Sequence, residues 1–85
     1  MKDFKLALKH LLLSLSIRQT IYKDLYHEEI GDSYFLLARA YCGLEDFAET
    51  RNMLDQSLEH YSHALGENHP QTLMVKRCII DKPQS

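Results

Sequence analysis

Hydrophobic residues in the first third of the chain return every three or four positions, which is the spacing of one face of an α-helix. The residues that follow this pattern are Phe4, Ala7, Leu8, Leu11, Leu12, Leu15, Ile21, Tyr22 and Leu25. We therefore predict a helix over residues 3–25, with Asp3 as its N-cap. Leu6, Leu13 and Ile17 lie off the stripe, which indicates that this helix packs against neighbours on more than one side.

The same spacing predicts three more helices, joined by short polar connections. The second carries hydrophobic residues from Ile30 onward and stops at Gly43, and the third is capped by Asp46 and stops at Gly66. The fourth is expected over 70–80, with a proline in its first turn. Because no segment alternates with a period of two between hairpin turns, no strand is expected. Four helices joined by short loops indicate an all-α fold of antiparallel helix pairs.

The sequence also repeats itself. Several residues of the first helix recur 43 positions later, and a histidine recurs after 42. The pairs are Asp3–Phe4 with Asp46–Phe47, Leu11 with Leu54, Ser14–Leu15 with Ser57–Leu58, and His27 with His69. Small and large residues recur in the same order, which matters because small residues let helix backbones approach while large ones fill the gaps. We interpret this as a duplicated unit of two helices.

The repeated unit resembles a tetratricopeptide repeat. The pattern reads Tyr34-x2-Leu37-Ala38-x2-Tyr41, then Phe47, Thr50-x3-Leu54 and Ser57-Leu58. The link Leu65-Gly66-x2-His69-Pro70-x-Thr72 is similar to that of the long, kinesin-light-chain type of this repeat. Thr50 and Ser57 depart from the family pattern, because alanine is usual at both positions. The resemblance implies an antiparallel α-α superhelix whose first helices line a concave surface.

The resemblance also sets a frame for the 85 residues. Residues 3–25 form the second helix of one repeat, 30–66 form a complete repeat, and 70–80 form the first helix of a third repeat or a cap. A repeat cannot cover its own hydrophobic face and needs neighbours. We therefore expect either a longer array or a homo-oligomer held together by exposed apolar helix faces.

Composition narrows the choice of partners. Ten Lys and Arg residues against twelve Asp and Glu give a net charge of −2, which argues against a broad phosphate-binding face and hence against nucleic acid. The hydrophobic runs fall well short of the ~20 residues that span a bilayer, so no membrane partner is expected. Cys42 and Cys78 do not make a disulfide framework, which favours a reduced, cytoplasmic protein.

Candidate chemistry is sparse. His60 and His63 fall on one side of a helix, but no second pair completes the four ligands of a structural zinc site. We interpret them as part of an exposed polar face, and His27 and His69 as link residues that bond nearby backbone. Cys42 lies in no nucleophile motif. We therefore predict no catalytic residue, no metal and no cofactor, and no enzyme activity.

The candidate binding residues lie on the two first helices of the repeats. On the second helix of the chain, Asp32, Phe35, Arg39 and Cys42 are expected to turn away from the partner helix. The corresponding residues 42 positions later include Met74 and Arg77. An apolar anchor beside arginine is suited to an acidic peptide or helix. The alternative is that the adjacent helix buries Phe35 and that Arg39 is merely solvated.

These observations favour a protein-interaction scaffold or adaptor that binds a protein or peptide. Two further classes stay open. In the first, the chain is the non-catalytic helical appendage of a larger enzyme, because repeats of the kinesin-light-chain type also occur in such appendages. It is alternatively a self-assembling structural module whose binding surface is filled by a second copy.

Overall fold

The computed structural model describes residues 3–23 and 25–81, and it confirms the all-α fold. Its four helices are α1 (Phe4–Tyr22), α2 (Glu28–Gly43), α3 (Phe47–Leu65) and α4 (Pro70–Asp81). Within those two described stretches there is no strand. Among the described residues, no helix combines the length and the hydrophobicity that a membrane-spanning segment requires.

Two helix boundaries differ from the sequence prediction. The first helix ends at Tyr22, because Lys23 takes a positive φ of 56° and leaves the helical path. The second helix begins at Glu28, two residues earlier than predicted, because the His27 side chain provides its N-cap.

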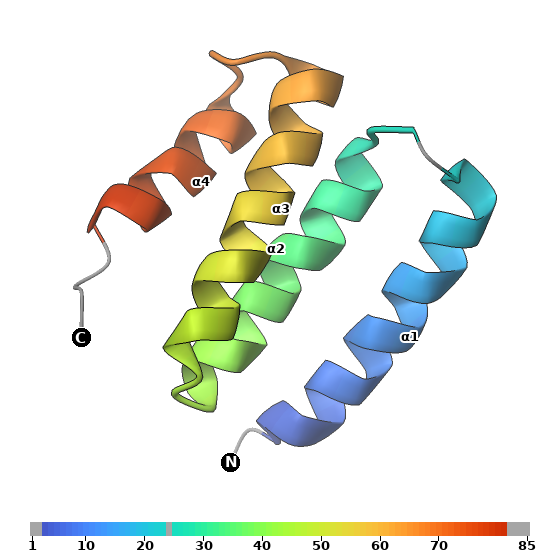
Figure 1. Cartoon of the computed structure of the whole chain (residues 1–85), viewed down its shortest axis with the longest axis vertical. Helices are drawn as coiled ribbons and strands as arrows, with labels where there is room; N and C mark the ends of the chain where they lie inside the picture. The colour runs from blue at the N-terminus through green and yellow to red at the C-terminus, as the bar shows by residue number, and fades with distance from the viewer. Residues whose placement is uncertain (1–2, 24, 82–85) are drawn as a thin grey trace.

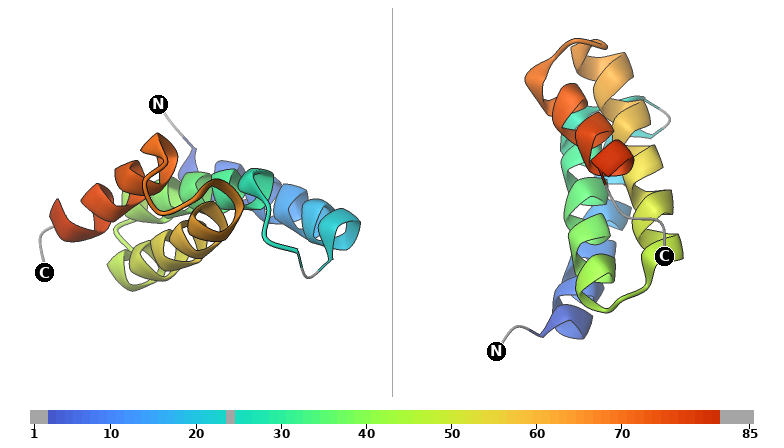
Figure 2. Two further views of the ribbon diagram at one scale, coloured as in Figure 1. Left: turned by 90° about the horizontal axis from the view of Figure 1, so that it is seen from above. Right: turned by 90° about the vertical axis from the view of Figure 1, so that its left-hand side faces the viewer.

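Consecutive helices run antiparallel and form a row (Figure 1). Seen from above, α1 and α4 lie at opposite ends of the row, with α2 and α3 between them (Figure 2). The α2–α3 contact is the most extensive, followed by α1–α2 and α3–α4. Each inner helix therefore has neighbours on two sides, whereas α1 packs mainly on α2.

The helix starts repeat in matched pairs. Asp3 and Asp46 each cap a helix of nineteen residues, and their carboxylates accept the backbone N–H of Leu6 and Glu49 at 3.0 and 3.3 Å. His27 and His69 lie before α2 and α4, and the Nδ1 of each accepts a backbone N–H two residues further on, at 3.1 and 3.2 Å. These bonds satisfy donors that a helix leaves unpaired. The repeat seen in the sequence is therefore also a repeat of local structure.

The core consists of two hydrophobic clusters. One joins α1 to α2 through buried Leu15, Ile30 and Leu37. The other joins α2, α3 and α4 through buried Ala38, Leu54, Tyr61 and Val75. Met53 packs against both clusters and makes the core continuous.

We expect truncation of the core to test this arrangement. Leu37→Ala and Leu54→Ala each remove a nearly fully buried side chain, so each should lower the free energy of unfolding by ~2–4 kcal/mol in urea denaturation. Leu36→Ala is the control, because Leu36 also lies on α2 but is 44% exposed. Its cost should stay within ~0.5 kcal/mol. Equal losses for Leu36 and Leu37 would contradict the assigned core.

A second prediction concerns the close approach of α2 and α3. A Cβ at Gly31 would lie 2.8 Å from two ring carbons of Tyr61, so Gly31→Ala should destabilise the protein by ~1–3 kcal/mol through overpacking. Alanine at an uncrowded helix position would instead stabilise by up to ~1 kcal/mol. Urea denaturation distinguishes the two signs, and a gain in stability would show that the helices separate freely at this point.

Candidate partner-binding surface

The predicted binding residues of α2 do not all turn away from α3. Asp32 is half-buried and accepts a hydrogen bond from the Tyr61 hydroxyl, so it faces α3 rather than solvent. Phe35 is half-buried and packs against the cluster that joins α2, α3 and α4. The expectation that Asp32 turns away from α3 is therefore wrong, and Phe35 is partly covered, which is closer to the alternative in which a neighbouring helix buries it. The reason is tertiary: Tyr61 of α3 bonds Asp32, and Phe35 packs on a cluster to which α3 and α4 also contribute.

The other predicted residues remain nearer to solvent. Arg39 on α2 and Arg77 on α4 are exposed, and neither forms an ion pair with any residue in the described part of the chain. Met74 is 39% exposed, and Cys42 is half-buried in the last turn of α2. The exposed members therefore offer two guanidinium groups and one flexible hydrophobic side chain.

A cluster of histidine and tyrosine rings forms where α1, α2 and α3 meet, and the sequence analysis missed it. The ring of Tyr22 stacks on His27 with centroids 3.8 Å apart, and Tyr26 stacks on His63 at 4.0 Å. The backbone N–H of His27 donates to Nδ1 of His60 at 3.2 Å. We call these five residues the histidine cluster. The link between α1 and α2 is thereby fastened to the C-terminal half of α3.

The histidines of the links have the role expected from the sequence, whereas His60 does not. His27 and His69 bond nearby backbone, which confirms their interpretation as link residues. His60 was predicted to lie on an exposed polar face, but it is half-buried and also lies 5.8 Å from the ring of Tyr34. Its partners His27 and Tyr34 lie far from it in the sequence, so periodicity within α3 gives no indication of them.

Burial lowers the pKa of His60 below its usual value of 6.5. Glu59 opposes this shift, and the neighbouring His63 and His27 add to it. The geometry agrees with the direction of the shift, because a protonated Nδ1 could not accept the N–H of His27. The uncharged ring is therefore the form that holds the link in place.

The described residues contain no group of three or more histidine, cysteine or acidic side chains placed to hold a metal ion. The histidine cluster instead uses the Nδ1 atoms of His27 and His60 for backbone hydrogen bonds. The histidine cluster therefore has a structural role, because it connects the α1–α2 link to α3 and caps α2.

Comparisons with family models, with curated proteins and with solved structures gave no match to this chain.

We expect stability to depend on pH through His60. Its pKa is lower in the folded chain than the usual value of 6.5, so below that pH the unfolded state binds more protons and folding is opposed. The stabilisation is complete above about pH 6.5 and is lost as the pH falls through the folded-state pKa. Urea denaturation between about pH 7.5 and about pH 5 measures this loss.

The control for this effect is His60→Asn, because an amide oxygen keeps an acceptor near the position of Nδ1 but does not titrate. The variant should show a smaller decrease in stability over the same pH range. An unchanged decrease would assign the effect to other groups.

Proposed function

We propose that this protein is an interaction scaffold built from tetratricopeptide-type repeats, without catalytic activity of its own, and that it works in the cytoplasm. The observation that carries the proposal is the duplication of capped helix pairs, with Asp3 and Asp46 before α1 and α3, and His27 and His69 before α2 and α4. Stacked repeats of this kind present an extended surface on rigid elements. Such a surface binds by complementarity that exists before the partner arrives.

The surface proposed for binding is formed by α2 and α4. Arg39 and Arg77 are exposed on these helices, Met74 is exposed on α4, and half-buried Phe35 packs against the cluster that joins α2, α3 and α4. Two guanidinium groups without ion pairs among the described residues favour a ligand that carries carboxylates. The proposed partner is therefore an acidic peptide or helix with an apolar side chain that reaches Met74 and Phe35.

Charge reversal tests this surface. A partner captured with the full chain and then purified should bind the double variant Arg39→Glu, Arg77→Glu at least about tenfold more weakly in calorimetric titration, because two charge-assisted bonds become repulsive. The free energy of unfolding should change by less than ~0.5 kcal/mol, since both side chains are exposed.

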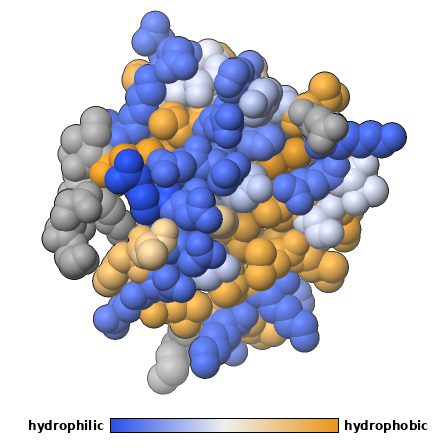
Figure 3. All heavy atoms as spheres, in the orientation of Figure 1, coloured by the Kyte–Doolittle hydropathy of each residue, from blue (hydrophilic) through white to orange (hydrophobic). Residues whose placement is uncertain are grey.

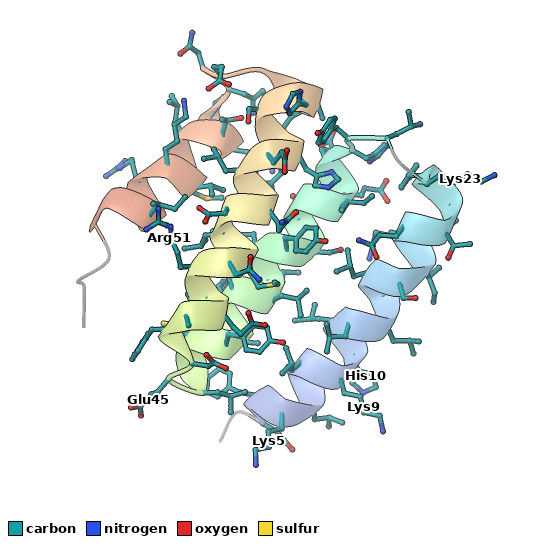
Figure 4. The ribbon with its side chains drawn as sticks, viewed as in Figure 1. Lys5, Lys9, His10, Lys23, Glu45 and Arg51 are labelled. Carbon is teal, nitrogen blue, oxygen red and sulfur yellow. The ribbon has the colours of Figure 1, made fainter. Side chains whose placement is uncertain are left out.

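Arg51→Glu is the matched control, because Arg51 (labelled in Figure 4) is an exposed arginine on α3. It pairs with Asp55 at 3.2 Å. The Arg51 variant should leave binding unchanged. A partner that loses affinity for the Arg51 variant and keeps it for the double variant would place the binding surface on α3 and refute the proposal for α2 and α4.

A further inference from the structure

The outer side of α1 carries an exposed hydrophobic stripe. Leu6, His10, Leu13 and Ile17 follow one another at intervals of four, three and four residues, so they lie on one face of the helix. The three hydrophobic members are 51, 62 and 54% exposed. We call these four residues the α1 stripe. In Figure 3, hydrophobic side chains gather on the side of the molecule where Figure 1 places α1, next to a more hydrophilic surface over α3.

The internal repeat allows the α1 stripe to be compared with the equivalent face of α3. The residues of α3 that stand 43 positions after the α1 stripe are Glu49, Met53, Gln56 and His60. All four are half-buried, and α2 makes the most extensive contact with α3. His60 contacts the ring of Tyr34 on α2, and Met53 packs against the cluster that contains Leu37 of α2. At the same place in the repeat, α3 has a helix against it and α1 is open.

The α1 stripe is also more hydrophobic than its counterpart. Leu6 replaces Glu49, Leu13 replaces Gln56 and Ile17 replaces His60. If these α1 residues faced only water, polar side chains would be expected there, because solvent-facing helix surfaces are normally polar. The hydrophobic residues of the α1 stripe therefore favour a surface that is covered by the hydrophobic side chains of another helix.

The charges on α1 indicate the chemistry of that second helix. No acidic residue occurs between Phe4 and Tyr22, whereas Lys5 and Lys9 are exposed beside the stripe and Lys23 is exposed at its C-terminal end. Figure 4 shows these lysines projecting outward from α1. A row of cations along one edge of an apolar stripe is complementary to an apolar stripe flanked by carboxylates. If two copies paired through α1, the positively charged lysines of one copy would instead approach those of the other and repel them.

We propose that the α1 stripe docks an amphipathic helix of a partner protein, whose hydrophobic residues recur every three or four positions and are flanked by Asp and Glu. The helix lies along α1 as α2 lies along α3. This interaction uses a different surface from the one formed by α2 and α4, so it does not rest on the proposed function of that surface.

A peptide of residues 27–44 is a suitable probe, because it contains α2, the helix that covers the equivalent stripe of α3. It is acidic, with Glu28, Glu29 and Asp32 against a single Arg39. A fluorescent form titrated into the full chain should bind saturably. The double variant Leu13→Asp, Ile17→Asp should weaken binding at least about tenfold, and Lys5→Glu, Lys9→Glu should weaken it and reduce its dependence on salt.

Leu36→Asp is the matched control, because it also places a carboxylate at an exposed leucine but on α2. It should leave the affinity unchanged, and circular dichroism should show equal helicity for all variants. Binding that is insensitive to Leu13→Asp, Ile17→Asp would mean that the peptide replaces α2 in the fold, and it would overturn the proposal.

A short isolated peptide forms little helix, so a tethered version provides a second measurement. Residues 27–45 joined directly before Asp3 reproduce the connection between α2 and α3 and raise the effective concentration of the helix. The melting temperature should rise, and Leu13→Asp, Ile17→Asp should abolish the rise. If neither the free nor the tethered helix acts through Leu13 and Ile17, the proposal is wrong.

Two other occupants of the stripe are outcomes of the same experiment. Light scattering that shows a dimer lost on Leu13→Asp, Ile17→Asp would assign the stripe to a second copy. Binding to phosphatidylcholine vesicles that contain phosphatidylserine, lost in the same variant, would assign it to a membrane surface. Either result without peptide binding would refute a partner helix.

Discussion

The close approach of α2 and α3 at Gly31 holds together the two helices that make the most extensive contact in the molecule. The ring of Tyr61 occupies the space that any side chain at Gly31 would need, and the Ser57 hydroxyl donates to the carbonyl of Gly31 at 2.8 Å. Small residues at a helix crossing bring backbones together and let dispersion contacts accumulate. Because Tyr61 also bonds Asp32, this crossing fixes which side of α2 faces α3.

The crossing of α2 and α3 also brings the residues of the histidine cluster together. With α3 held against α2, His60 reaches the backbone of His27, and the link between α1 and α2 becomes part of the packed structure. The histidines at the helix starts use imidazole nitrogen where Asp3 and Asp46 use carboxylate oxygen. Imidazole accepts a hydrogen bond through Nδ1 only while that nitrogen is unprotonated. Two kinds of cap therefore alternate along the chain.

The repeat gives the molecule two surfaces with different chemistry. The surface of α2 and α4 carries exposed Arg39 and Arg77 with half-buried Phe35, whereas the outer side of α1 carries leucine and isoleucine beside lysine. α1 contains no acidic residue, although the whole chain has a net charge of −2. On α2, by contrast, Arg39 shares its helix with Glu28, Glu29 and Asp32. Exposed basic side chains on both surfaces favour partners that bring carboxylates to them.

Most of the local structure could be predicted from the residues alone. Helix periodicity, the Asp46 cap and the glycine stops gave the four helices, and the 43-residue offset gave the repeat, because these depend on neighbours a few positions away. The surroundings of Asp32, Phe35 and His60 could not be predicted in this way, because their contacts come from residues far along the chain. The tertiary structure also decided that Leu13 is exposed while its counterpart Gln56 is half-covered. Periodicity identifies the faces of a helix, but which faces are covered depends on how many helices pack around it.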